Sequence, residues 1–217
     1  ASDVYKRQPP RIPFSPPPQA SAAGGGPSAA GVVFAARPCQ WKAMAADPPD
    51  TPMLTLVLGG TRSGKSRYAE TLLGPLPKPW LYIATAQAFD EEMRARIAEH
   101  RGRRGPEWET VEAPLDLPAA LLRARHRPVL VDCLTLWLSN LILGERDLEA
   151  AAVALETALA QRSAPAVLVS NEVGLGIVPE NALARRFRDA AGILHQRLAE
   201  RAERVVFTVA GIPMVVK

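Results

Sequence analysis

A glycine-rich octapeptide is the segment of this 217-residue chain whose residue types and spacing most clearly could do chemistry. Residues 59–66 read Gly-Gly-Thr-Arg-Ser-Gly-Lys-Ser, which fits the pattern G-x-x-x-x-G-K-[ST] between an apolar run and a helical pattern. In that context the segment predicts a phosphate-binding loop rather than an ordinary glycine-rich turn. Lys65 would reach the β- and γ-phosphates, and the Ser66 hydroxyl would ligate Mg²⁺. The residues expected to surround the phosphates are Gly59, Gly60, Thr61, Arg62, Ser63 and Gly64.

Asp132 is the second candidate, because it ends the apolar run 129–132. In a phosphate-loop fold, the acid at the end of such a strand holds the Mg²⁺ shell. We therefore predict a metal-binding role for Asp132 beside Ser66. The alternative is a solvated strand-end aspartate that caps the following helix.

His100 and the basic residues after it are the third candidate. His100 shares a predicted helix face with Met93 and Ile97, and a lone histidine in that position is usually a core or capping residue. The segment 101–104 carries three arginines, which form the one tight basic cluster of the sequence. The cluster could neutralise a phosphorylated ligand, or it could be a solvated turn at the negative end of a helix.

The elements that must position these residues follow from the hydrophobic pattern. Short apolar runs predict strands over 53–58, 80–84, 128–132, 166–170 and 204–209, and residues 214–216 could add another. Helical patterns cover 64–73, 90–101, a stretch ending at 141, 148–159 and 183–198. The alternation predicts the α/β class, with a P-loop NTPase-like, mostly parallel sheet and helices on both faces.

The composition divides the chain into two parts. Residues 1–52 hold 11 of the 21 prolines and few large apolar residues, so we predict a Pro/Gly-rich disordered extension there, which could be non-native sequence. A transit peptide would form an amphipathic helix, which the prolines oppose. Residues 53–217 have the length and apolar content of one catalytic domain with a sizeable core.

The same composition argues against several classes of protein. No apolar run approaches the roughly 18 residues of a membrane span, so none is expected. Two cysteines make no disulfide framework, which favours a reducing, cytoplasmic location. A net charge of +4, without a basic run interleaved with aromatic residues, predicts no nucleic-acid partner. The sequence also lacks the N-K-x-D type motif of regulatory GTPases.

The segment Leu58–Glu70 resembles the opening of the adenosylcobinamide kinase/adenosylcobinamide-phosphate guanylyltransferase family. Further blocks match in order over 82–86, 90–101, 131–140, 170–181 and 187–198. The string Asn-Glu-Val-Gly at 171–174 is far more specific than the phosphate loop. The resemblance covers 53–217, which it identifies as a P-loop kinase/guanylyltransferase domain, and residues 1–52 have no counterpart in it.

The resemblance implies a bifunctional enzyme of cobalamin biosynthesis. Such an enzyme phosphorylates adenosylcobinamide with ATP or GTP and then transfers GMP from GTP to adenosylcobinamide phosphate, giving adenosylcobinamide-GDP and pyrophosphate. In the family a histidine carries the GMP covalently, and that histidine corresponds to His100. A neutral imidazole with a pKa of about 6.5 suits this attack at pH 7. The family also implies a Mg²⁺ cofactor and a homotrimer.

The resemblance further implies which residues bind nucleotide. Thr85 would contact it through backbone and hydroxyl, and Glu112 would accept hydrogen bonds from ribose or guanine unless it is only an exposed strand-end residue. Asn171 and Glu172 could position cobinamide, a metal-bound water or only their own loop. Cys133 is expected to be a buried small residue and not a nucleophile. Besides the phosphate loop and Asp132, the implied nucleotide-binding residues are Ala84, Thr85, Ala86, Arg101, Gly102, Arg103, Arg104 and Glu112.

Three alternatives to the bifunctional enzyme remain open at this point. A P-loop kinase of another small hydroxyl compound would use Lys65, Ser66 and Asp132 and leave His100 idle. A GTP-binding switch without turnover, or a nucleic-acid-dependent ATPase, would also contain a phosphate loop. Labelling with α-³²P GTP distinguishes the kinase from the bifunctional enzyme. Release of pyrophosphate from GTP would argue against the switch, and salt-sensitive binding to DNA or RNA would indicate the ATPase.

Overall fold

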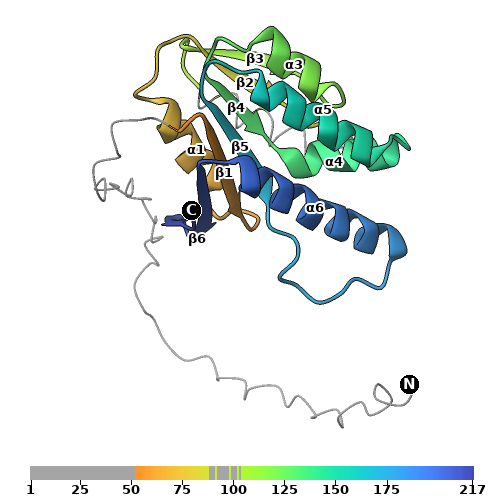
Figure 1. Cartoon of the computed structure of the whole chain (residues 1–217). Coiled ribbons are helices and arrows are strands. Elements are labelled where there is room, and N and C mark those ends of the chain that lie inside the picture. Colours follow the sequence, from red (N-terminus) through yellow and green to blue (C-terminus); the bar gives the residue numbers. More distant parts are fainter. Residues whose placement is uncertain (1–51, 88–90, 92–97, 99–101, 103) are drawn as a thin grey trace, which may run out of the picture. The chain divides into compact units, whose positions relative to one another are not determined.

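The computed structural model of the chain describes residues 52–87, 91, 98, 102 and 104–217 (Figure 1). The strands are β1 (Leu54–Gly59), β2 (Trp80–Ala84), β3 (Trp108–Glu112), β4 (Val129–Asp132), β5 (Ala166–Asn171), β6 (Arg204–Val209) and β7 (Ile212–Val215). The helices are α1 (Lys65–Leu73), α3 (Leu117–Arg123), α4 (Leu134–Leu143), α5 (Leu148–Ala160) and α6 (Ala182–Arg201). Glu91, Ala98 and Gly102 are also helical, whereas the rest of the helix expected over 90–101 and the extension at 1–51 lie outside the described residues.

The seven strands form one sheet in the order β3-β2-β4-β5-β1-β6-β7. All neighbouring pairs are parallel except β6 and β7, which form an antiparallel hairpin. The predicted fold class is thereby confirmed: the sheet is mostly parallel and the connections between its parallel strands carry helices.

Helices cover both faces of the sheet. Leu56 and Leu168 point to the face where α3, α4, α5 and α6 pack, and their neighbours Val57 and Val169 point to the face covered by α1. Because successive strand residues alternate between faces, a strand buried on both sides must be apolar throughout, as β5 is over its first four residues. Figure 1 shows the four helices in front of the sheet and α1 separated from them.

The carboxyl ends of the parallel strands meet at one edge of the sheet, and this edge carries the candidate residues. The phosphate loop follows β1, Asp132 ends β4, and Asn171 ends β5, which lies between β1 and β4. Open α/β sheets bind their ligands at this edge. The topology therefore brings residues that are far apart in sequence to a single region.

Helix capping distinguishes α1 from three other helices. Asn181 caps α6 by accepting hydrogen bonds from the amides of Leu183 and Ala184, and Asp147 and Asp116 cap α5 and α3 in the same way. Helix α1 follows Gly64, and no side chain caps its first turn. An anion at this end of α1 would therefore not compete with a side-chain cap.

Strand β3 and helix α3 are elements that the sequence patterns did not predict. The strand Trp-Glu-Thr-Val-Glu lies at the edge of the sheet and alternates with charged residues, so it lacks the apolar run of a central strand. Helix α3 has only seven residues, which is too short for a clear helical period. Its start is nevertheless signalled by Asp116 as the cap and Pro118 in the first turn.

Candidate active site

The phosphate loop has the backbone that its glycines were expected to permit. Gly64 has a φ of 90°, in the left-handed region, immediately before α1 begins. A side chain at this position would also meet the Cα of Gly211 at 3.0 Å. Gly211 belongs to the β6–β7 turn, and its amide donates to the Ser63 carbonyl at 2.7 Å. The loop is thus held from one side by the hairpin, and Gly64 is needed for both conformation and space.

Lys65 lies inside the loop that it is expected to serve. Its Nζ donates to the carbonyl of Gly60 at 3.1 Å, and its side chain is buried. The ammonium group is therefore held over the loop, next to the uncapped first turn of α1. Ser66 follows on α1 and is half-buried, whereas Thr61 and Arg62 are exposed. Together these groups provide the positive potential that a chain of phosphates requires.

Asp132 is half-buried at the end of β4 and accepts a hydrogen bond from the phenol of Tyr82 at 3.1 Å. The alternative role for Asp132 does not occur, because α4 follows Cys133 and has no side-chain cap. Burial raises the pKa of Tyr82 strongly, and the neighbouring Asp132 carboxylate raises it further. Tyr82 therefore stays a neutral donor that fixes the direction of the carboxylate.

Arg104 reaches the same region from the segment that precedes β3. Its guanidinium lies 3.5 Å from the centroid of the Tyr82 ring. Its Nη1 atom is buried and has no hydrogen-bond partner among the described residues. This buried guanidinium donor lies beside Tyr82, the hydrogen-bond partner of Asp132. It is therefore a suitable contact for a phosphate oxygen.

A network of hydroxyl and amide groups joins the ends of β2, β4 and β5. The buried Thr85 hydroxyl donates to the Cys133 carbonyl at 2.7 Å and accepts from the Cys133 amide at 2.8 Å. The Asn140 side chain donates to the Thr85 carbonyl at 2.8 Å. Asn171 donates through Nδ2 to the Thr135 hydroxyl at 2.8 Å. Thr85 therefore holds two strand ends together, and its half-buried neighbours Ala84 and Ala86 border the open edge.

Glu112 lies away from the phosphate loop. It is exposed at the end of β3 and pairs in register with Ala84 on β2. Strands β2, β4 and β5 lie between β3 and β1, so β3 and β1 are roughly 19 Å apart at about 4.8 Å per strand. The candidate residues thus extend along the sheet edge from Lys65 to Glu112, and Asp132 and Ala84, which pair in register, lie between these two ends. Gly102 is exposed, while His100, Arg101 and Arg103 lie outside the described residues.

The donors available for a metal are oxygen atoms. Ser66 lies in the first turn of α1, after β1, and Asp132 ends β4, with β5 between these two strands. The Ser66 hydroxyl and the Asp132 carboxylate are both ligand types that Mg²⁺ accepts. No group of three His, Cys, Asp or Glu side chains gathers as a metal site in the part of the chain that the structure describes. These residues therefore fit an ion that takes its remaining ligands from water and phosphate.

Cys133 and His195 are buried groups near this edge with different character. Cys133 is a free thiol, and burial followed by the charge of Asp132 raises its pKa to about 11. The prediction that Cys133 is a buried small residue is confirmed, and the raised pKa disfavours the thiolate that a nucleophile would need. His195 on α6 lies 2.7 Å from the Ser170 hydroxyl through Nε2. No sequence motif marks His195 and Ser170 as a pair.

Comparison with known proteins decides the family. The sequence model of the family described as cobinamide kinase / cobinamide phosphate guanyltransferase matches residues 55–216. The chain belongs to this family.

Curated relatives of this cobinamide kinase / guanyltransferase family agree over nearly their whole length. The bifunctional adenosylcobalamin biosynthesis protein CobP of Pseudomonas aeruginosa is 53% identical over 169 residues, covering 76% of this chain and 98% of CobP. CobU of Salmonella typhimurium is 45% identical over 182 residues, covering 76% of this chain and all of CobU. The resemblance stated from the sequence is confirmed.

Two solved structures align with part of this chain at low sequence identity. A type III secretion ATPase aligns with a TM-score of 0.48 and 8% identity over 71% of this chain and 50% of that protein. The RadB recombinase aligns with a TM-score of 0.40 and 18% identity over 71% and 73% of the two chains.

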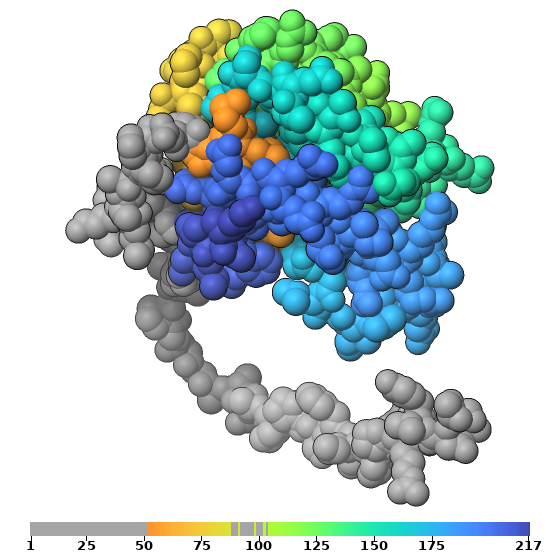
Figure 2. Space-filling view, in the orientation of Figure 1, coloured from red at the N-terminus to blue at the C-terminus, as the bar shows by residue number. Residues whose placement is uncertain are grey.

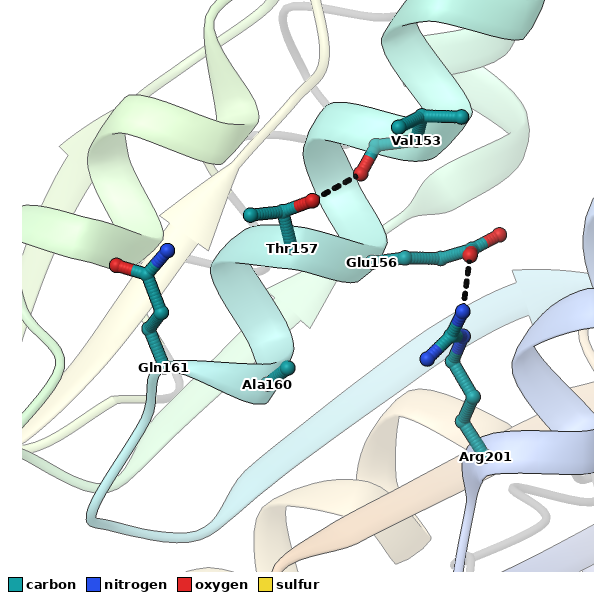
Figure 3. Close-up of a pocket in the computed structure, with 6 residues that line it drawn as sticks. All are labelled: Val153, Glu156, Thr157, Ala160, Gln161 and Arg201. Atoms are coloured by element: carbon teal, nitrogen blue, oxygen red, sulfur yellow. Dashed lines mark hydrogen bonds and ion pairs between the residues drawn. The ribbon is translucent and has the colours of Figure 1, made fainter.

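A hollow of about 320 Å³ lies between α5 and α6, away from these residues (Figure 3). It is bordered by Val153, Glu156, Thr157, Ala160, Gln161 and Arg201. Helices α5 and α6 end here, just before β5 and β6 begin, so the hollow is at the amino edge of the sheet. The candidate active site of this cobinamide kinase / guanyltransferase family member is at the opposite edge. No helix in the described ranges has the length and apolar character to cross a membrane.

Proposed function

We propose that this chain is a bifunctional enzyme that phosphorylates adenosylcobinamide and then converts the phosphate to adenosylcobinamide-GDP. Membership of the cobinamide kinase / cobinamide phosphate guanyltransferase family supports both activities. The observation that carries the kinase half is the buried Lys65 ammonium held over the phosphate loop at the uncapped start of α1.

In the first step, the hydroxyl of the cobinamide side chain attacks the γ-phosphorus of ATP or GTP. The bond between the γ-phosphorus and the bridging oxygen breaks, and the nucleoside diphosphate leaves. Lys65 and the first amides of α1 stabilise charge on the transferred group. Ser66 and Asp132 would hold Mg²⁺, which when bound neutralises charge on the β- and γ-phosphates. Tyr82, which donates a hydrogen bond to Asp132, would hold the carboxylate in place for that ion.

In the second step, an imidazole nitrogen of His100 attacks the α-phosphorus of GTP, and pyrophosphate leaves. The phosphate of the first product then attacks the same phosphorus, and the bond to histidine breaks to give adenosylcobinamide-GDP. Covalent catalysis thus divides one displacement into two. Arg101, Arg103 and Arg104, beside Gly102, would neutralise the phosphates in this reaction.

The distance between Lys65 and Glu112 along the sheet edge supports the use of two nucleotide positions. Lys65 follows β1 and Glu112 ends β3, and three other strands lie between β1 and β3, so one nucleotide is poorly placed to touch both residues. We propose that the phosphate loop serves the kinase step. Guanylyl transfer would then use Ala84, Ala86, Arg104 and Glu112. Thr85 would hold the end of β2 in place through its hydrogen bonds to Cys133.

Incubation with α-³²P GTP tests the guanylyl half of the proposal. The wild type should acquire label that is stable to base and lost in acid, as a phosphoramidate is. His100→Ala should remain unlabelled and keep kinase activity, because direct phosphoryl transfer does not use that nucleophile. An active wild type without label would instead support the kinase-only alternative.

We also propose that the chain forms homotrimers in the cytoplasm. An exposed apolar edge supports self-association, because Ile212, Met214 and Val215 of β7 are each more than half exposed. The free, buried Cys133 suits a reducing compartment. Light scattering should give three times the 23.3 kDa mass of the chain, and a monomeric mass would contradict the trimer.

A further inference from the structure

The connection between β5 and α6 exposes apolar side chains that the proposed chemistry has not used. Leu175 is 82% exposed and Ile177 is 97% exposed, the two highest values among large apolar residues in the described ranges. Val178 is 58% exposed. Figure 1 shows the segment after β5 running out from the sheet before it returns to α6, and Figure 2 shows it on the surface below the helices. We call residues 175–178 the apolar loop.

The connection that carries the apolar loop begins beside the phosphate loop. Asn171 pairs in register with Gly59, and the amide of Glu172 donates to the Gly59 carbonyl at 3.0 Å. Asn171 is itself held by the Thr135 hydroxyl. The segment therefore leaves the sheet edge directly beside the place where the γ-phosphate is proposed to bind.

Both ends of this connection are fixed, so the exposure is confined to its middle. Val173 packs against the small core of Leu138, Ile142 and Ala191. At the other end, Arg185 donates to the Pro179 carbonyl at 2.9 Å, and Asn181 caps α6. Residues 175–178 present their apolar side chains between these two anchored ends.

The turn between β6 and β7 lies against the phosphate loop on the side away from β5. On the β6 side, the turn at Gly211 packs directly on the loop, with its amide 2.7 Å from the Ser63 carbonyl. This turn occupies the β6 side of the phosphate loop, whereas the connection that carries the apolar loop leaves the sheet on the β5 side. An acceptor that approaches over β5 would therefore meet the apolar loop. A corrin ring carries methyl and methylene groups around its rim, and burying such groups against aliphatic side chains is favourable.

We propose that Leu175, Ile177 and Val178 form the surface that binds the corrin ring of the acceptor in the kinase step. The side-chain hydroxyl of the acceptor would then extend toward the phosphate held by Lys65. This inference rests on the proposed function and adds to it a binding surface for the acceptor, separate from the nucleotide contacts.

Steady-state kinetics of a Leu175→Ser/Ile177→Ser double variant test the assignment. We expect the KM for cobinamide to rise about tenfold or more, since two aliphatic contacts are removed, while the KM for ATP stays within about twofold of wild type. Equilibrium dialysis of cobinamide, followed by its visible absorbance, should show the same weakening. A Leu175→Met/Ile177→Met variant should retain the wild-type KM.

The matched control is a Val153→Ser/Ile193→Ser variant, which removes two exposed apolar side chains from α5 and α6. It should keep both KM values. Light scattering on all variants tests whether the apolar loop instead contacts a second copy of the chain. A change in mass for the loop variant, or an unchanged KM for cobinamide, overturns the inference.

Failure of the proposed function gives a different result from failure of this inference. If the folded wild type does not phosphorylate cobinamide, both the proposed function and the proposed acceptor surface are wrong. An active wild type whose loop variant binds and phosphorylates cobinamide normally would remove the acceptor surface alone.

Discussion

Tyr82 connects the two parts of the candidate active site at the scale of single residues. Its phenol donates to Asp132, and its ring carries the Arg104 guanidinium. In a Tyr82→Phe variant the ring contact can remain while the hydrogen bond is lost. We expect the Mg²⁺ concentration for half-maximal kinase activity to rise several-fold, about 3- to 10-fold, with little change in the KM for cobinamide.

Two measurements define this prediction. An Asp132→Asn variant should lose much more kinase activity than Tyr82→Phe, because it removes a charged metal ligand rather than the group that orients it. Thermal unfolding of Tyr82→Phe should stay close to wild type. If Mg²⁺ dependence is unchanged in Tyr82→Phe, the phenol has no orienting role.

Because His195 is buried, we expect the free energy of unfolding to depend on pH. Burial lowers its pKa below the ordinary value of 6.5, with the nearby Glu172 charge acting in the opposite direction. As the pH falls below 6.5, the unfolded chain binds a proton that the folded chain still excludes. The free energy of unfolding should therefore fall over this range, by at most about 1.4 kcal/mol per pH unit.

Denaturant unfolding between pH 7.5 and 5.5 checks this prediction. A His195→Gln variant keeps a polar group near Ser170 and should show a flatter pH dependence than wild type. His126→Gln, at an exposed position, controls for the loss of an imidazole. Equal slopes for wild type and His195→Gln would rule out the buried imidazole as the cause.

The sequence was informative for residues whose type is required by chemistry at a fixed place along the chain. Lys65 and Asp132 could be predicted because a phosphate loop and a strand-end acid have recognisable local contexts. Tyr82, Thr135 and Asn140 could not, because their importance comes from contacts across strands and helices. Thr85 was flagged for ligand contact, yet its hydroxyl is buried against Cys133, 48 positions away in sequence.

At the scale of elements, the ion pairs between α5 and α6 connect two of the helices that cover one face of the sheet. Glu156 on α5 is buried and accepts hydrogen bonds from Arg197 and Arg201 on α6. Figure 3 shows the contact with Arg201. Burial alone would raise the pKa of Glu156, but the hydrogen bonds from the two arginines outweigh it and lower the pKa. The carboxylate is therefore charged and fully paired between the helices.

A Glu156→Gln variant should lower the Tm by roughly 2–5 °C, because two guanidinium groups lose a charged partner in a partly buried place. Glu149→Gln is the matched control, since Glu149 also pairs with Arg197 but its side chain is 73% exposed. Differential scanning calorimetry should show a smaller change for the control. Similar shifts for both variants would mean that the burial of Glu156 adds nothing.

Elements with strong periodicity were predicted well, and those shaped by position in the sheet were not. Strands β2 and β6 begin and end where the apolar runs do, because both strands are largely buried. The edge strand β3 carries Glu109 and Glu112 between less polar residues, so its pairing with β2 decides its conformation. The order β4-β5-β1 likewise depends on long-range pairing and was not predictable from local patterns.

At the scale of the whole molecule, the family match leaves residues 1–52 outside the part of the chain that its relatives share. The family match begins at residue 55. The part of this chain that aligns with CobP and CobU is 76% of its length, and it covers 98% and 100% of those two proteins. Within the described residues, the sheet begins at β1 directly after Met53. The Met53 amide donates to the Glu203 carboxylate at 2.7 Å, just before β6.

A chain that starts at Met53 should therefore retain kinase activity, guanylyl transfer and a Tm within about 2 °C of the full chain. Its new ammonium group would lie at the position that already donates to Glu203, so the first strand keeps its anchor with an added charge. A Glu203→Gln substitution in the short chain should lower the Tm more than it does in the full chain, because only the short chain pairs a charged amine there. Loss of either activity in a folded short chain would show that residues 1–52 contribute to catalysis.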